Sequence, residues 1–261
     1  MLKDRLKNIG EDPKYIPGVY NYCDRWCERC PFTSRCLNYE ISEEHFAEPG
    51  SRDMNNELFW KKLSETFQAT LELVQEMMEE QGIDIDTIDT EPIKRRERRI
   101  DKEVDNNELI VSARDYGKIA GEWFESTKNL FLEKEIDLNK KVELELPNEN
   151  PDKEAAAILD AVDVIMWYLH FIEVKLRRAV HGELEDRFEI PDDFPKDSDG
   201  SAKVALIAID RSIAAWGEIL KYFPDQEDEL LQILVSLEQL RRNAEKMFPN
   251  ARSFVRPGFD K

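Results

Sequence analysis

Apolar residues recur at steps of three and four through most of this chain, and almost no segment alternates as a half-buried strand does. Because an α-helix repeats every 3.6 residues, this spacing gathers apolar side chains on one helical face. Long helices joined by short loops predict an all-α helical bundle of about five helices. The ranges that carry the pattern are 53–81, 107–133, 152–182, 201–223 and 225–247.

Turn-forming residues mark where these helices begin and end. Asn150 and Pro151 predict the start of the third helix, and Gly182 predicts its end. This helix is the most apolar, so we expect it at the centre of the bundle. Residues 83–105 are polar and predict a linker, and the aromatic tail 248–259 predicts a segment packed back on the bundle.

All four cysteines lie in one fourteen-residue stretch. Two disulfides closing loops this short would stabilise little, whereas four thiolates on one loop are the donors that a soft metal centre needs. The surrounding residues are rich in aromatic and turn-forming side chains. We therefore expect residues 1–50 to form an irregular metal-binding arm and residues 51–261 to form the bundle. The expected ligands are Cys23, Cys27, Cys30 and Cys36.

The spacing of the cysteines, C-x3-C-x2-C-x5-C, bears on which metal they bind. Structural zinc sites more often pair two C-x2-C turns across a longer span. A 4Fe-4S cluster offers four separate irons, which closely spaced cysteines on a winding loop can each reach. The spacing favours the cluster, and Zn(II) remains the alternative cofactor. Four protein ligands saturate the irons, which leaves electron transfer, sensing or structural support.

The segment Cys27-Glu-Arg-Cys30-Pro31-Phe32-Thr-Ser-Arg-Cys36 resembles the second half of the 4Fe-4S loop of helix-hairpin-helix DNA glycosylases. The resemblance implies a 4Fe-4S cluster. That family has six residues between its first two cysteines, where this chain has three, and no other part of the chain resembles it. The glycosylase activity is therefore not implied. The first three cysteines also resemble the motif of radical S-adenosylmethionine enzymes, whose alternating strands and helices are not expected here.

The formal net charge of −19 argues against duplex nucleic acid as a general ligand, because that binding relies on cationic groups. The basic run Lys94–Arg99, reinforced by Lys102, is the local exception, and we interpret it as a solvated linker or helix start, with a docking patch for a partner or nucleic acid as the alternative. The N-terminus has no apolar leader and no long uncharged apolar window follows, so we expect a cytoplasmic protein and no membrane insertion. The expected partner is a protein or a small molecule, and the sequence is compatible with a homo-oligomer.

Acidic residues interrupt the apolar run of the third helix. Asp160, Asp163 and His170 fall on one predicted helical stripe, and Asp210 lies among apolar residues of the fourth helix. Buried carboxylates need a metal, a cation or a dense hydrogen-bond network. Two interpretations stay open from the residues alone: a carboxylate-bridged di-metal oxidoreductase site, or acids paired with arginines. His45 and His181 are expected at surface or loop positions without a site.

A second resemblance concerns the same acids. Glu122-Trp-Phe-Glu125, followed by Asp160-Ala-Val-Asp163 and an apolar stretch, is similar to the motifs of MazG-type all-α nucleotide pyrophosphohydrolases. The resemblance implies Mg²⁺ held by Glu122, Glu125, Asp160 and Asp163, orienting nucleotide phosphates and activating water. The chain departs from that family by an Asp at position 160 and by a long interval between the motifs.

Overall fold

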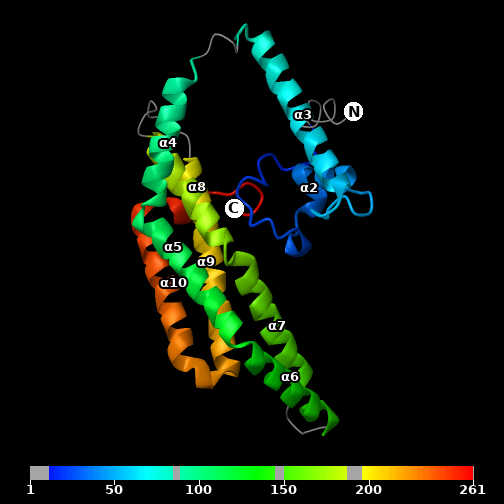
Figure 1. Cartoon of the computed structure of the whole chain (residues 1–261), viewed down its shortest axis with the longest axis vertical. Coiled ribbons are helices and arrows are strands. Elements are labelled where there is room, and N and C mark those ends of the chain that lie inside the picture. The colour runs from blue at the N-terminus through cyan, green and yellow to red at the C-terminus, as the bar shows by residue number, and fades with distance from the viewer. Residues whose placement is uncertain (1–11, 85–88, 145–149, 187–195, 261) are drawn as a thin grey trace. The chain divides into compact units, whose positions relative to one another are not determined.

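The computed structural model describes residues 12–84, 89–144, 150–186 and 196–260, and every regular element in them is helical (Figure 1). This confirms the predicted all-α class. The chain divides into two compact units, one formed by Met1–Arg96 with Val255–Lys261 and the other by Glu97–Phe254. The division therefore differs from the expected boundary at residue 50.

The first unit begins with the cysteine-containing segment and continues into helices. Its elements are η2 (Cys27–Arg29), η3 (Thr33–Arg35), α2 (Leu37–His45) and α3 (Glu57–Glu80), and α4 (Glu91–Asp105) starts in this unit and ends in the second. Asn56 caps α3, because its side-chain oxygen accepts a hydrogen bond from the Leu58 N–H at 2.9 Å. The predicted helix over 53–81 is thus present.

The end of the tail belongs to the first unit. The Phe259 ring packs edge-on against Phe32, with the ring centroids 4.9 Å apart. Gly258 has a positive φ of 78° and lies close to the side chains of Ile16 and Val19, so a Cβ there would be both strained and crowded. The expectation that the whole tail packs on the bundle is wrong for these residues.

The second unit is a helical bundle centred on one long helix. Its helices are α5 (Glu108–Ser126), α6 (Lys128–Glu143), α7 (Pro151–Tyr168), α8 (Phe171–Glu185), α9 (Asp197–Tyr222) and α10 (Glu227–Met247). Helix α9 packs against α7, α8 and α10, while α5 packs against α8 and α10. Fully buried aromatic residues lie at the α5–α9 contact, where Trp216 Nε1–H donates to the Tyr116 hydroxyl at 3.2 Å.

Two of the predicted helices are each two helices. The predicted range 107–133 breaks at Thr127, whose hydroxyl and backbone N–H both donate to the Trp123 carbonyl and end α5. The range 152–182 breaks between Tyr168 and Phe171, and α9 replaces it as the central helix. Helix α8 then continues through Gly182 to Glu185. A Cβ at Gly182 would lie 3.5 Å from Ser198 Cβ, in van der Waals contact with the first turn of α9, so a side chain larger than that of alanine would meet Ser198.

The predicted linker over 83–105 is wrong for its second half. Residues 91–105 form α4, which buries Ile100 and Val104 at one-turn spacing and exposes its charged residues. The sequence analysis missed this helix because charged residues outnumber the apolar ones in it.

By length and composition alone, one described stretch, Pro151–Glu185, is apolar enough to cross a membrane. It is divided here into α7 and α8, and both helices pack on α9. Core helices of bundles commonly satisfy the same criterion.

Candidate metal centre

Two short 3₁₀ turns wind the chain between the cysteines. Cys27 begins η2, and Cys30 ends it by donating its N–H to the Cys27 carbonyl at 3.1 Å. Cys36 ends η3 in the same way, with its N–H on the Thr33 carbonyl at 3.2 Å, and precedes α2. Arg25 adopts a positive φ of 61°, a conformation uncommon for residues other than glycine. These turns reverse the chain within a few residues and so bring distant cysteines of the loop together.

All four cysteines line one small cavity of about 20 Å³. Each is half-buried, and none forms a disulfide. Aromatic side chains line the same cavity: Tyr20, Trp26, Phe32, Tyr39 and Phe259. The expected grouping of Cys23, Cys27, Cys30 and Cys36 around one volume is therefore present in the loop.

The thiols are close enough to influence one another's ionisation. Burial raises the pKa of Cys27 first, and the neighbouring Cys23, Cys30 and Cys36 raise it further. Burial also raises the pKa of Cys30, partly offset by the Phe32 N–H, which donates to Cys30 Sγ at 3.4 Å. Four thiolates in one loop repel each other, so the fully deprotonated set requires a bound cation or cationic cluster.

The spacing of the sulfurs differs from that of a closed zinc site. Four thiolates around one Zn(II) at about 2.3 Å lie roughly 3.8 Å apart. Among the described residues, no three of the cysteine sulfurs lie within 4.8 Å of one another. Zinc would therefore require the sulfurs to move inward. A 4Fe-4S cluster would require the cavity to widen, because it is larger than a space of about 20 Å³.

The loop is locally basic in an otherwise acidic chain. Between the first and last cysteine it carries three arginines against two acids, which are Arg25, Arg29, Arg35, Asp24 and Glu28. The Arg29 guanidinium stacks over the Trp26 ring at 3.9 Å, and Arg35 Nε donates to the Lys14 carbonyl at 3.3 Å. Asp24 and Glu28 act in the opposite direction, since Asp24 raises the pKa of Cys30 and Glu28 raises the pKa of Cys27.

The acids of the bundle lie on its surface. Glu122, Glu125, Asp160 and Asp163 are all exposed, so the prediction that the acids of the third helix are buried is wrong. Glu122 lies 3.9 Å from the Lys118 ammonium, and Glu125 lies 2.5 Å from that of Lys128. Helix α7 buries only the stripe of Ile158, Ala161, Ile165 and Tyr168, which places residues 160 and 163 on other faces.

His170 does not share a helical stripe with these acids. It lies at the turn between α7 and α8, as the N-cap of α8, and is exposed. Within the described part of the chain, His170 and the four acids do not form a group of three or more donors within 4.8 Å.

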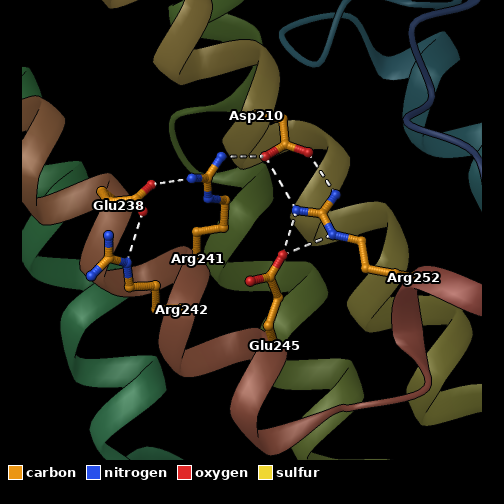
Figure 2. Close-up of polar contacts among 6 residues, drawn as sticks. All are labelled: Asp210, Glu238, Arg241, Arg242, Glu245 and Arg252. Atoms are coloured by element: carbon orange, nitrogen blue, oxygen red, sulfur yellow. Dashed lines mark hydrogen bonds and ion pairs between the residues drawn. The ribbon is translucent and has the colours of Figure 1, made fainter.

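Asp210 is paired with arginines, as Figure 2 shows. Arg252 donates to both carboxylate oxygens at 2.6 and 3.3 Å, and Arg241 donates at 3.3 Å. Glu245 and Glu238 hold the far sides of the same two guanidinium groups. The network joins α9, α10 and η7 (Ala251–Ser253), so Asp210 has a structural role in this geometry.

The structure gathers a second group of donors that the sequence analysis missed. His181 and Glu185 of α8 lie beside Glu97 of α4, and each has a ligand atom within 4.8 Å of the others. The local signal was the four-residue spacing of His181 and Glu185, which puts both on one face of a helix. Their partner on α4 is far away in sequence and lay in the expected linker.

Comparisons with protein-family models, with curated proteins and with solved structures find no match to this chain.

Proposed function

We propose that Cys23, Cys27, Cys30 and Cys36 hold a 4Fe-4S cluster that serves in electron transfer or redox sensing. The observation that supports it most is the convergence of all four free thiols on one cavity, from a loop that carries no other donor of comparable softness. Zinc as a structural ion is the alternative occupant, and the test below separates the two.

One further feature supports the cluster over zinc. No three sulfurs are as close together as a single tetrahedral ion needs, whereas a cluster distributes its thiolates over four irons. A centre with four thiolate ligands carries net negative charge with either occupant, and the loop supplies three arginines. The backbone N–H of Phe32 donates to Cys30 Sγ, and hydrogen bonds to cluster sulfurs are one of the ways in which proteins set a reduction potential.

The chain supplies four protein ligands, so the cluster would have no open iron for substrate. The chemistry that remains is reversible gain and loss of an electron, or response to an oxidant that dismantles the cluster. Thiols kept free for this purpose suit a reducing compartment such as the cytoplasm. The partner would then be a redox protein or a small oxidant or reductant.

The test is anaerobic purification of the full chain, followed by iron, sulfide and zinc analysis and a visible absorption spectrum. We expect a brown protein with iron and sulfide in equal amounts, and potentiometry should give reversible one-electron reduction. Cys→Ser at each of the four positions should lose or destabilise the centre, whereas Ser34→Ala in the same loop should leave it intact. A colourless protein with one zinc per chain would reduce the role to structural support, and a metal-free protein would refute the site.

The aromatic wall offers a second measurement. Phe259 lines the cavity, so Phe259→Ala should admit solvent and make the visible absorption fade faster in air. Val255→Ala, at an exposed position of the same tail, is the matched control. Equal rates in both variants would show that the tail does not shield the centre.

A further inference from the structure

A group of nitrogen and oxygen donors lies between α4 and α8, within the second unit. Glu97 and Asp101 are four residues apart on α4, and His181 and Glu185 are four residues apart on α8. Four residues is about one helical turn, so each helix presents two donors from one face.

The imidazole of His181 is surrounded by three carboxylates. Its Nε2 lies 3.7 Å from Glu97 Oε2 and 3.8 Å from Asp101 Oδ1, and its Nδ1 lies 3.3 Å from Glu185 Oε2. Glu97, His181 and Glu185 are the only three such donors within 4.8 Å of one another in the residues that the structure describes. The acids come from both helices, so the group is an inter-helix contact.

Both helices bury apolar residues near this group. Ile100 and Val104 are buried beneath α4, and Ala179, Val180 and Leu184 are buried beneath α8. One turn away, Arg177 Nη1 donates to Asp105 at 2.7 Å and joins the same two helices. The donors themselves are accessible, because 29% of the His181 side chain and 39% of the Glu97 side chain are exposed. An ion could therefore enter from solvent without moving the helices.

The four donors by themselves carry excess negative charge. Even with a protonated imidazole, three carboxylates leave a net charge of −2 (three negative charges and one positive). Basic residues flank Glu97 and Asp101 on α4, from Lys94 to Lys102, and Lys94 pairs with Glu91 at 3.6 Å. On α8, Arg177 pairs with Asp105 and Arg178 with Asp197, both at 2.7 Å. A divalent ion would neutralise the excess and relieve the mutual repulsion of the acids.

We propose that Glu97, His181 and Glu185, with Asp101 as a further donor, bind a divalent first-row transition-metal ion that joins α4 to α8. Metal–ligand bonds of about 2.0–2.2 Å place neighbouring donors roughly 3–3.5 Å apart, so small side-chain rotations close the observed gaps. One ring nitrogen coordinates the ion and leaves the other to donate to a remaining carboxylate, as ligating imidazoles usually do. Mixed imidazole and carboxylate donors suit Mn²⁺, Fe²⁺ or Zn²⁺ and differ from the thiolate set of the arm.

Titration of the full chain with Mn²⁺, followed by the electron paramagnetic resonance signal of the free ion, tests this site. Mn²⁺ prefers oxygen and nitrogen donors to thiolates, so it reports on the bundle and not on the cysteines. We expect one ion per chain, with binding weakened about tenfold or more in His181→Ala and in Glu97→Gln. His170→Ala, which removes another exposed imidazole near α8, should bind Mn²⁺ as the native chain does.

Thermal melting separates a metal site from a simple ionic contact. Mn²⁺ should raise the melting temperature of the native chain and of Cys23→Ser, and this gain should be absent in His181→Ala. Absence of binding by the native chain, or equal binding by the native chain and His181→Ala, would overturn the proposal. The proposal would also be overturned if His181→Ala lost the same stability with and without Mn²⁺, because ion pairs alone explain such a loss.

Discussion

The Asp210 network offers a quantitative test of how this bundle uses its acids. Asp210→Asn keeps the shape of the side chain but removes the charge that Arg241 and Arg252 share (Figure 2). Its amide would also turn an N–H group toward one of the guanidinium groups. The native carboxylate accepts three hydrogen bonds, and its side chain is 36% exposed.

The expected cost follows from this partial exposure. A fully exposed ion pair contributes about 0.2–1 kcal/mol, and a hydrogen bond to a charged group shielded from water contributes about 1.5–3 kcal/mol. Two half-exposed arginine partners place Asp210 between these limits, so Asp210→Asn should lower the free energy of unfolding by about 1–2 kcal/mol. For a unit of this size that corresponds to a fall in melting temperature of roughly 2–8 °C.

The assay is urea unfolding of the native chain, Asp210→Asn, Arg252→Met and the double variant, followed by circular dichroism. The double-mutant cycle should give a coupling of about 1 kcal/mol that shrinks at high salt, where exposed charges are screened. Asp115→Asn, at an exposed position of α5, is the matched control and should change stability by less than about 0.5 kcal/mol. A coupling below about 0.3 kcal/mol, or Mg²⁺ stabilisation that disappears in Asp210→Asn, would refute the structural role.

Two further predictions test the packing of the bundle. Gly182→Val should destabilise the protein by about 1–3 kcal/mol, because the valine methyl groups would crowd Ser198. Gly121→Val is the control: a Cβ at position 121 has no neighbour within 4 Å, so this variant should be neutral or stabilising. Equal effects of the two substitutions in urea unfolding would contradict the close approach of α8 and α9. Tyr116→Phe should cost about 1 kcal/mol at pH 7 by removing the acceptor of the Trp216 N–H. Burial raises the pKa of Tyr116 from about 10 to about 12, so the unfolded chain loses this proton first and native stability falls between those pH values. The variant lacks that loss, so unfolding measured above pH 10 should show the difference shrinking, and a constant difference would contradict it.

Local signals in the sequence determined the helical class and several helix ends. Asn107 and Asn150 each cap a helix through a side-chain oxygen and stand where the sequence predicts a start, whereas Asn56 caps α3 three residues after the predicted start at 53. The grouping of the cysteines was also predictable, because only twelve residues lie between Cys23 and Cys36 and two tight turns suffice to close the loop. Such features depend on neighbours a few residues away, which the sequence states directly.

The sequence did not predict the break at Thr127 or the helix over 91–105. No proline or glycine marks the break, and α5 ends where the Thr127 hydroxyl donates to the Trp123 carbonyl. In α4 the charged residues outnumber the apolar ones, and burial of Ile100 and Val104 supplies the stabilisation that composition does not predict.

Only the tertiary packing determines which acids are exposed and which form ion pairs between helices. We predicted Asp160 and Asp163 to be buried because α7 is apolar. The central helix is α9 instead, and both acids are exposed on the surface of α7. Asp210 pairs with arginines of α10 and η7, and His181 contacts Glu97, which lies 84 positions earlier in the chain. The sequence determines the amphipathic face of each helix, but which faces meet depends on the packing of all helices at once, and long-range pairs of charges depend on that packing.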